Sequence, residues 1–402
     1  MEQPHDVLIV GGGPAGMMAG LLFARAGIRV KVIEKHGDFF RDFRGDTVHP
    51  STMEVLAQLG LLDRFLDRPH NRVHSARIRI GGREWTIGDL SHLDTPAPFI
   101  AMMPQWEFLD FLRDEACGYP GFVLAMEEPV EAFTQSNGRV DGVRYRSGRE
   151  ERAGRLVIAA DGRGSLVRTL DMLPVESLGA PMDVLWFKVP KIDDGGDALR
   201  GSVEPNRMVV LIDRDDYWQA AFLIPKGQEV AVRSKGLGWL RLEVQKAFPD
   251  MQLSGEFLTS DDDLKLLSVA LDRLTEWSRP GLLAIGDAAH AMSPIGGIGI
   301  NLAIQDAVAA ANILAKPLAS GQSVDTLLPR VQERRLFPTR IIQSGQKAAQ
   351  DNIIGRVLRG GPIQVPALIR LLDRYPLLRR IPGRIIGLGI RRERVKSPKA
   401  YA

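Results

Sequence analysis

Three short stretches of this sequence place glycines directly after an apolar run, in spacings that could bind a ligand through the backbone. They are DVLIVGGGPAG from Asp6, RLVIAADGRGS from Arg155 and GLLAIGDAAHAMSPIGGIGIN from Gly281. Glycine lets a ligand come close to the main chain, and the free N–H groups at the start of a following helix attract anions. The chemistry that these residues predict is the binding of a phosphate-bearing ligand.

The first stretch has the spacing GxGxxG at Gly11, Gly13 and Gly16. The first glycine allows a tight turn, the second lets the backbone approach a pyrophosphate, and the third lets the helix pack on the strand. Residues 6–35 read as an apolar strand, a helical pattern and a second strand, which indicates a βαβ unit. We expect a dinucleotide to contact the residues of this turn: Gly11, Gly13, Pro14, Ala15 and Gly16.

Glu34 ends the second strand, with Lys35 beside it. A carboxylate at this place accepts hydrogen bonds from both ribose hydroxyls of an unphosphorylated adenosine. The residue type therefore favours FAD or NAD over NADP at this site.

The other two stretches repeat the pattern of a strand followed by glycine and an acid. The second ends in Asp161 and Gly162, and the third reaches Gly286 and Asp287 before a proline and a glycine loop. The run from Gly299 onward favours a helix. We expect the backbone N–H groups of the loop and the helix N-terminus to face a negatively charged group.

Together, the three motifs resemble the signatures of the flavoprotein monooxygenases built like para-hydroxybenzoate hydroxylase, and the resemblance covers nearly the whole chain. It implies that Asp287 accepts a hydrogen bond from a ribityl hydroxyl of FAD. Asp161 and its turn would support the flavin pyrophosphate region and the nicotinamide cofactor. Arg44 matches the family's arginine beside the flavin's linker, and Gln105 matches a glutamine that meets the ribityl chain.

The same resemblance places the third glycine loop against the pyrimidine edge of the flavin. Pro294 matches the family's proline beside the reactive flavin carbon, and Gly296 and Gly297 would supply N–H groups that favour the anionic reduced flavin. We expect these three residues to have the catalytic role, and His290 to be structural. The remaining cofactor contacts expected here are Gly299, Ile300 and Asn301.

The fold class that follows is α/β: a Rossmann-like FAD-binding domain interrupted by a β-sheet substrate domain, with C-terminal helices. The FAD-binding domain would comprise residues 1–72, 98–180 and 270–345, and the substrate domain residues 73–97 and 181–269. We expect residues 346–402 to form a basic helical segment. Apolar walls for an aromatic or lipophilic substrate would come from Trp186, Trp218 and Phe222.

Charge is distributed unevenly along the 402 residues. The net charge is +3, but the segment from Arg330 to Ala402 holds 17 Lys and Arg against 4 Asp and Glu. Such a segment can meet an anionic membrane surface or nucleic acid, but a solvated helical face or a homodimer contact is the favoured interpretation. No nucleic-acid motif accompanies it, and no metal-ligand pattern is present. The single cysteine and the absence of a signal-peptide pattern predict a cytoplasmic protein, peripheral to the membrane at most.

The predicted function is an FAD-dependent monooxygenase that uses NADPH or NADH and O2 to hydroxylate or epoxidise a small molecule through a flavin C4a-hydroperoxide. No second GxGxxG is present, which agrees with the family's transient use of the nicotinamide cofactor. The alternative is a reductase of prenyl or lipid chains similar to geranylgeranyl reductases, because FLIPKG from Phe222 partly matches their motif. Lipid-directed ubiquinone-pathway hydroxylases are intermediate. A halogenase, whose WxWxIP pattern is incomplete here, and a non-enzymatic flavin sensor are less favoured.

Overall fold

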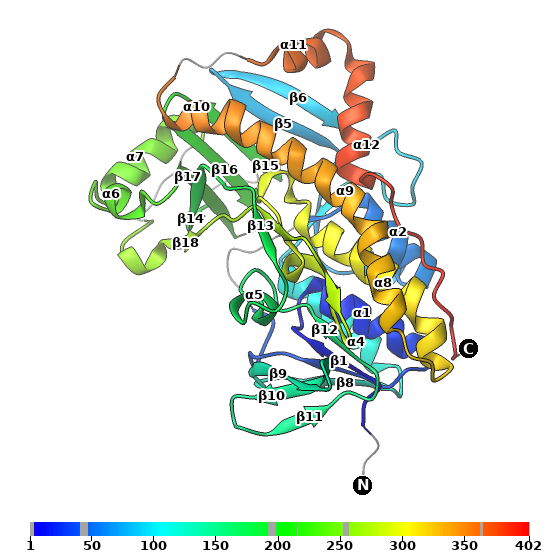
Figure 1. Ribbon diagram of the computed structural model, residues 1–402. Helices are drawn as coiled ribbons and strands as arrows, with labels where there is room; N and C mark the ends of the chain where they lie inside the picture. Colours follow the sequence, from blue (N-terminus) through cyan, green and yellow to red (C-terminus); the bar gives the residue numbers. More distant parts are fainter. Residues whose placement is uncertain are drawn as a thin grey trace.

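A computed structural model describes residues 4–40, 47–191, 198–214, 216–251, 257–361 and 365–401. Two sheets lie at opposite ends of the molecule, and long helices run between and beside them (Figure 1). The α/β class predicted from the sequence is confirmed.

The first sheet has six strands, of which all but the edge strand β20 run parallel. Alternate side chains point to opposite faces: Val7 and Ile9 meet the helices, whereas Leu8 and Val10 meet a three-stranded sheet on the other side. In spatial order the strands are β20 (Ser278–Arg279), β21 (Leu282–Ala284), β12 (Leu156–Ala159), β1 (Val7–Val10), β2 (Val30–Ile33) and β8 (Phe122–Ala125). The covering sheet comprises β9 (Val130–Ser136), β10 (Arg139–Tyr145) and β11 (Glu150–Arg152).

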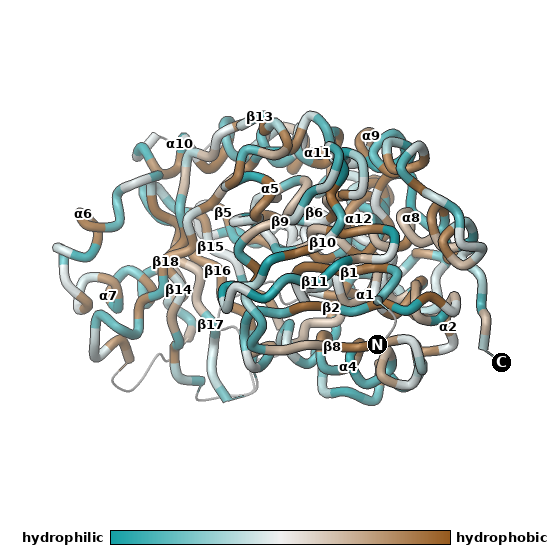
Figure 2. The backbone as a smooth tube through the Cα atoms, turned by 60° about the horizontal axis from the view of Figure 1, so that its bottom comes forward, coloured by the Kyte–Doolittle hydropathy of each residue, from teal (hydrophilic) through white to brown (hydrophobic). Residues whose placement is uncertain are grey.

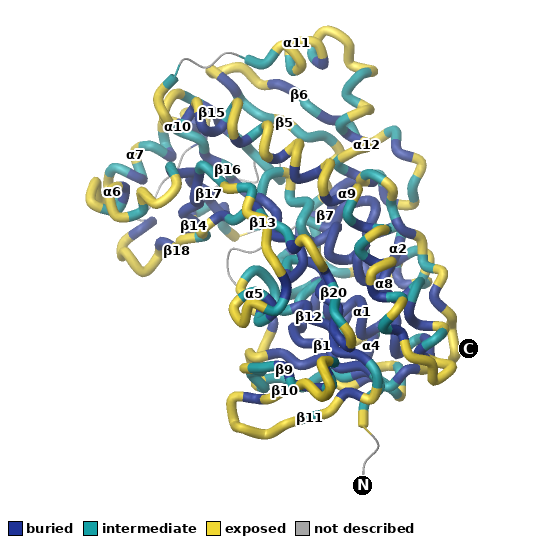
Figure 3. The backbone as a smooth tube through the Cα atoms, in the orientation of Figure 1, coloured by how far each residue is buried: buried dark blue, intermediate teal, exposed yellow. Residues whose placement is uncertain are grey.

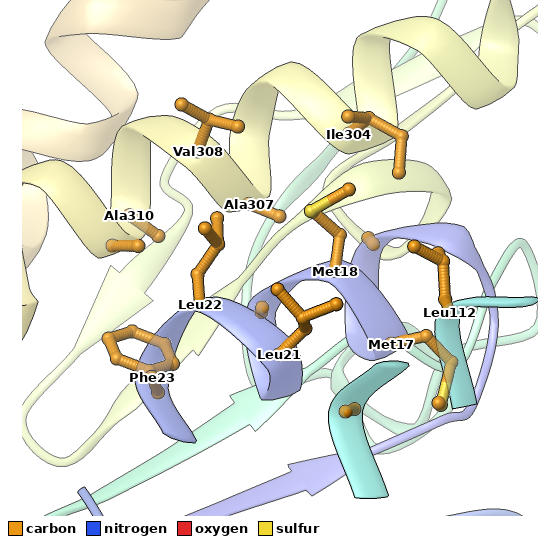
Figure 4. Close-up of a cluster of buried hydrophobic side chains, with 14 of the residues drawn as sticks. Met17, Met18, Leu21, Leu22, Phe23, Leu112, Ile304, Ala307, Val308 and Ala310 are labelled. Atoms are coloured by element: carbon orange, nitrogen blue, oxygen red, sulfur yellow. The ribbon is translucent and has the colours of Figure 1, made fainter. Parts of the chain in front are cut away.

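The helical layer on this sheet is formed by α1 (Pro14–Arg25), α4 (Gln105–Cys117) and α8 (Gly299–Ala319). Leu22 and Met18 of α1 pack against Val308 and Ile304 of α8 (Figure 4), and all four side chains are buried. The segment Ile295–Ala319 is long and apolar enough to cross a membrane by length and composition, but 78% of its apolar window is buried inside the protein. Helix α8 is therefore the central helix of this core.

The second sheet has seven strands and draws them from two separate parts of the chain. Residues 75–89 supply two strands, and β15 pairs with β5 in parallel to join them to the rest. In spatial order the strands are β18 (Lys265–Leu267), β14 (Met182–Pro190), β17 (Tyr217–Pro225), β16 (Arg207–Asp213), β15 (Leu199–Glu204), β5 (Ser75–Ile80) and β6 (Arg83–Asp89). Apolar residues run along β17 (Figure 2), because both faces of this sheet are covered.

The two faces of the seven-stranded sheet have different partners. Helices α6 (Glu229–Arg233) and α7 (Leu237–Ala247) cover the outer face. The inner face packs against residues of the first domain, including Ile100 and Met102 of strand β7 (Ile100–Met102), and against Ile295. We refer to this second surface as the inner face.

Short elements connect these layers. They are α2 (Pro50–Leu59), α3 (Leu62–Leu66), α5 (Leu166–Thr169), β3 (Thr47–Val48), β4 (Asn71–Val73), β13 (Val175–Ser177), β19 (Asp272–Leu274) and β22 (His290–Ala291). Strands β13, β19 and β22 form one small sheet, and β3, β7 and β4 form another.

The last helix of the described residues ends at residue 388. Helix α9 (Leu328–Ala349) runs past residue 345 into a π-helical turn at Gln350–Ile354 and then into α10 (Gly355–Leu358). Helices α11 (Ala367–Arg374) and α12 (Arg380–Leu388) lie against edge strand β6 (Figure 1).

The residues after α12 are not helical, although a helical segment to residue 402 was expected. They return to the first domain, where Val395 N donates to Gln58 Oε1 at 2.7 Å and Ala400 N donates to Arg25 O at 2.9 Å. The basic segment is therefore two helices on the second sheet followed by an extended strap along the first domain.

Glycine allows α12 to lie directly on strand β6. A Cβ atom at Gly383 would overlap the backbone of Asp89, whereas a Cβ at Gly345 in α9 would meet nothing within 4 Å. We expect Gly383→Ala to lower the free energy of unfolding by about 1 to 3 kcal/mol, because overpacking displaces the helix. Gly345→Ala is the matched control and should stabilise the protein by up to about 1 kcal/mol. Chemical denaturation of both variants checks this, and equal effects would contradict the assigned packing.

Candidate active site

The first glycine turn leaves room for a ligand at one position only. A Cβ atom at Gly11 would overlap Ala160, and one at Gly16 would overlap the Gly11 carbonyl, so the turn closes tightly onto strand β12. At Gly13, by contrast, the nearest atom to an added Cβ is 4.0 Å away. Gly13 is also the N-cap of α1 and makes no side-chain cap, and Pro14 is the first helical residue. The N-terminus of α1 can therefore accept an anion at Gly13 and Ala15.

Glu34 lies at the end of β2, directly beside this turn. Its Oε2 accepts a hydrogen bond from Gly12 N at 2.9 Å and its Oε1 accepts one from His36 N at 3.1 Å. The carboxylate is buried, whereas Lys35 is exposed. Glu34 is thus held in place by backbone donors next to the proposed dinucleotide site.

The second and third motifs meet through an arginine that the sequence analysis did not single out. Arg163 Nε donates to Asp287 Oδ2 at 3.1 Å, and Arg163 Nη2 donates to Met292 O at 3.0 Å. Arg163 therefore joins the turn after β12 to the loop after β21. Its place directly after Asp161 and Gly162 was the signal that could have identified it.

Two buried polar atoms at this junction have no hydrogen-bond partner among the described residues: Asp161 Oδ1 and Arg163 Nη1. The other oxygen of Asp161 accepts from Leu166 N at 2.8 Å at the start of α5. Burial raises the pKa of Asp161 above its ordinary value, in spite of its hydrogen bonds from Ser165 and Leu166. Next to it, Gly162 has φ +83° and open space where a side chain would be. Such unsatisfied groups fit a polar ligand at this place.

The third glycine loop turns sharply before it enters α8. Pro294 precedes a short turn in which Gly296 has φ +78° and Gly297 has φ +62°. A side chain at Gly297 would overlap Thr47, whose hydroxyl donates to the Gly297 carbonyl at 2.8 Å. Gly299 then begins α8. The positive φ values place these peptide groups in orientations that only glycine adopts readily.

The first turn of α8 is fixed from the side of α2. Asn301 Oδ1 accepts hydrogen bonds from His49 N at 2.9 Å and from Thr52 Oγ1 at 2.7 Å. Asn301 and Ile300 are both buried. The Asn301 side chain thus anchors the helix, which leaves its backbone as the part that could meet a ligand.

Asp306 is the buried carboxylate that ties this loop to two helices. It is fully buried, and its Oδ2 lies 2.6 Å from His290 Nε2 and accepts from Gly286 N at 3.1 Å. Its Oδ1 accepts from Arg335 Nε of α9 at 2.9 Å. Burial alone would raise the pKa of Asp306, but His290 and Arg335 hold it below its ordinary value. The structural role expected for His290 agrees with this position, 5.1 Å from the Trp277 ring.

Two glutamines of α9 hold the segment that leads to Pro294. Gln343 Nε2 donates to Ala291 O at 3.3 Å and to Asp272 O at 2.8 Å. Gln346 accepts from Ser293 N at 3.1 Å and donates to the carbonyls of Ser293 and Ile295, both at 3.0 Å. These side chains were not found from the sequence, because no local motif marks them.

The three proposed wall residues do not lie together. Trp186 is on the inner face, in a cluster with Val184, Leu223 and the adjacent Ile295. Trp218 and Phe222 are on the opposite face of the sheet, where they pack under α7 with Leu240 and Val244 among others. The placement of Trp218 and Phe222 removes them from the surface that the Pro294 loop approaches, and only Trp186 is kept as a candidate below.

Gln105 and Arg44 are the remaining cofactor contacts predicted from the sequence. Gln105 is the first residue of α4 and is half-buried. Arg44 lies outside the described residues.

The strand, turn and helix at Gly11–Gly16, together with the two acid-bearing loops, define a dinucleotide-binding flavoprotein. The family described as FAD binding domain matches residues 4–344, and the chain belongs to this family of flavoprotein monooxygenases. The chain is 30% identical to 6-methylpretetramide 4-monooxygenase of Streptomyces rimosus over 392 residues, covering 94% of this chain and 91% of the relative.

Two further comparisons agree on the fold. The chain is 25% identical to 3-demethoxyubiquinol 3-hydroxylase of Escherichia coli (strain K12) over 365 residues, covering 86% of this chain and 88% of the relative. The crystal structure of p-nitrophenol 4-monooxygenase from Pseudomonas putida DLL-E4 superposes with a TM-score of 0.78 at 22% identity, covering 98% of this chain and 100% of that one.

Loss of the Asp306 carboxylate should destabilise the protein in a pH-dependent way. Asp306→Asn removes the carboxylate that pairs with the buried Arg335 at 2.9 Å and leaves it only the longer contact to Glu393 at 3.5 Å, among the described residues. We expect the variant to lower the free energy of unfolding at pH 7 by about 3 to 5 kcal/mol. Because the folded-state pKa of Asp306 is lowered, its contribution is complete above the unfolded-state pKa of about 4 and is lost as pH falls through the folded-state pKa. The difference in the free energy of unfolding between wild type and Asp306→Asn should therefore become smaller at strongly acid pH.

Chemical denaturation at several pH values checks this. Asp262→Asn, at an exposed aspartate, is the control and should have little effect. If the difference in the free energy of unfolding between wild type and Asp306→Asn stays constant from neutral to strongly acid pH, the stabilising role of the ionised carboxylate is contradicted.

Proposed function

We propose that this monooxygenase hydroxylates an aromatic small molecule, with NADPH or NADH as the reductant and O2 as the oxygen source. The observation that carries the proposal is the similarity to 6-methylpretetramide 4-monooxygenase over almost the full length of both chains. The dinucleotide turn and the two acid-bearing loops that this chain presents are consistent with that chemistry.

The residues fit FAD at the level of individual atoms. The open position at Gly13 and the N-terminus of α1 would hold the pyrophosphate, and Glu34 would hold the adenosine ribose. Asp287, Asp161 and Arg163 would meet the ribityl and pyrophosphate region, where two of their atoms lack partners among the described residues. Bound FAD supplies the electron transfer and oxygen activation, which no side chain of the protein can supply.

The contribution of the chain to the reaction would be to position the substrate and to exclude water. The N–H group of Gly297 donates to Pro294 O at 3.1 Å, so it is not the free donor that the sequence predicted. The N–H group of Gly296 and the N-terminus of α8 would stabilise negative charge on the reduced cofactor. Trp186 and its apolar neighbours on the inner face, with Ile295 packed against them, would form a flat wall for an aromatic ring.

The reductase alternative is not favoured. The relatives are named as monooxygenases and hydroxylases, and the FLIPKG stretch has a structural explanation. Phe222 lies under α7, and Lys226 Nζ donates to Asp183 Oδ1 at 2.7 Å. Gly227 N donates to the other oxygen of Asp183 at 2.9 Å. The motif thus packs and fixes a strand end.

Oxygen incorporation tests the proposed function. One aromatic C–H bond becomes C–OH, one oxygen atom comes from O2, and the other leaves as water with two electrons from NADH or NADPH and a proton. We expect the FAD-loaded enzyme, given 18O2 and a panel of phenols and polycyclic phenols, to form a product that carries one 18O atom. NAD(P)H oxidation that yields only hydrogen peroxide with every aromatic, or electron transfer to a polyprenyl acceptor, would contradict it.

A variant separates a failure of the flavin site from a failure of the reaction. Asp287→Ala should purify with less FAD per protein, whereas the exposed Asp262→Ala should keep the wild-type amount, as measured from the flavin absorbance. Full flavin retention by Asp287→Ala would contradict the proposed cofactor contact.

We also propose that the C-terminal helices contact an anionic membrane surface. Helix α11, the turn after it and α12 expose a set of large apolar side chains, each at least 40% exposed, called here the C-terminal apolar face: Leu368, Leu371, Tyr375, Leu377, Ile381 and Ile385. Figure 3 shows α11 as mostly exposed. The spacing of Ile381 and Ile385 puts them on one side of α12, which also carries Arg380 and Arg384, and Leu377 lies in the short turn before the helix.

Positive charge continues beyond this face into a pocket of about 360 Å³. Its cationic lining consists of Arg334, Arg384, Arg391, Arg392, Arg394 and Lys396, against one acid, Glu393. Within the described part of the chain, Arg384, Arg391 and Lys396 form no ion pair. Apolar side chains beside unpaired cations match the chemistry of an anionic bilayer surface.

Sedimentation with vesicles of phosphatidylglycerol and phosphatidylcholine tests this contact. We expect binding at low salt that weakens as salt rises, and a loss of about tenfold or more in affinity for Leu377→Ser/Ile381→Ser, because apolar burial and charge act together. The control is Val230→Ser, which changes an exposed valine of α6 outside the C-terminal apolar face and should bind like wild type. Absence of vesicle binding by the wild type would contradict the membrane contact. A change from dimer to monomer in the double variant would also contradict it and would assign the C-terminal apolar face to a homodimer.

A further inference from the structure

Helix α9 and the π-helical turn that follows it bury a stripe of polar side chains in addition to apolar ones such as Val331 and Ile342. The stripe consists of Arg335, Thr339, Gln343, Gln346 and Gln350, all at most 4% exposed. Their spacing of three or four residues places them on one side of the helix. A buried polar stripe is costly unless each member is hydrogen-bonded, so each of these side chains requires a partner.

Successive members of the stripe bind successive parts of the third motif. Arg335 reaches Asp306, which holds His290 and Gly286. Gln343 then bonds Ala291, and Gln346 bonds Ser293 and Ile295. One helical turn beyond Gln346, directly after the end of α9, the next member is Gln350.

Gln350 is the member of the stripe that the protein leaves unsatisfied. Its side chain is 0% exposed, and neither Nε2 nor Oε1 has a hydrogen-bond partner among the described residues. Gln350 begins the π-helical turn Gln350–Ile354, a rare geometry that is concentrated at functional sites. Ile354, in the same turn, belongs to the inner-face cluster that contains Trp186 and contacts Ile295.

We propose that the Gln350 carboxamide is a substrate-recognition group, which pairs with a hydrogen-bond acceptor and a neighbouring donor on the aromatic substrate. The inference rests on the proposed monooxygenase function. A carboxamide offers one carbonyl acceptor and two N–H donors. It therefore selects planar molecules in which a carbonyl stands next to a hydroxyl or an amide N–H, such as phenolic amides, hydroxy ketones and lactams.

The location suits this role. The Trp186 wall and the Ile295 side chain are apolar and can hold the ring but cannot orient it. The buried Gln350 amide would orient the ring through hydrogen bonds. It would also select the substrate, because a site built to hydrogen-bond a polar group discriminates strongly against an analogue that lacks it. Gln350 would thus set which ring carbon faces the cofactor.

Thermal unfolding distinguishes this role from a structural one without any substrate. Gln350→Leu keeps the volume and removes two unsatisfied polar atoms, so the FAD-loaded variant should have a Tm equal to or above that of wild type. Gln346→Leu loses three hydrogen bonds to the loop and should have a lower Tm. A Tm of Gln350→Leu as low as that of Gln346→Leu would overturn the proposal.

Ligand binding tests recognition directly. The probes are 1-hydroxy-2-naphthamide and 1-naphthol, which share the ring and differ in the carbonyl and amide, and binding is followed by the change in flavin absorbance. We expect wild type to bind the naphthamide about tenfold or more tightly than 1-naphthol, and Gln350→Leu to bind both equally. Asn352→Ala, at an exposed amide in the same π-helical turn, should keep the wild-type preference.

The outcomes separate the two claims. Equal binding of the two probes by wild type, or an equal loss of both in Gln350→Leu, overturns the role of Gln350 even if 18O is incorporated into a product. Absence of 18O incorporation with every aromatic overturns the proposed function, and the Tm comparison still decides whether Gln350 is a structural residue.

Discussion

The fully buried carboxylate of Asp306 is the contact on which the geometry of the third motif depends. It joins α8 to two other parts of the chain: the segment after β21 that carries Gly286 and His290, and Arg335 of α9. Because a buried charge is tolerated only when it is paired and hydrogen-bonded, removal of any partner leaves a costly group in the core. The interaction therefore fixes where α9 lies relative to α8 and to the loop between Pro294 and Gly299.

Once α9 is fixed, the rest of the site follows from its position. Gln343 and Gln346 hold the segment that leads to Pro294, and the π-helical turn that begins at Gln350 brings Ile354 to the inner face. The same network extends to the strap after α12, since Arg335 Nη1 lies 3.5 Å from Glu393 Oε1. The loop that contains Pro294, the proposed substrate wall and the C-terminal strap are thus connected through α9.

The sequence predicted the local parts of this arrangement and not the long-range ones. The glycine turn, the βαβ unit and the three strand-plus-acid motifs are short, and their geometry is set by neighbouring residues, so they could be identified. The partners of Asp306 and of the Ser293 segment lie 29 and 53 residues further along the chain, and no local pattern links them. To predict which aromatic residues share a face of the sheet, the register of two strands must be known. Trp186 pairs with Ala221, so Phe222 points to the other face.

Amide hydrogen exchange of the FAD-loaded enzyme tests the central role of Asp306 most directly. Arg335→Leu removes one of the two side chains that contact its carboxylate, while His290 remains. The account predicts faster exchange in residues 286–301 than in wild type, with little change in α1 and in the strands of the six-stranded sheet. Unchanged exchange in residues 286–301, or an equal increase along the whole chain, would contradict it.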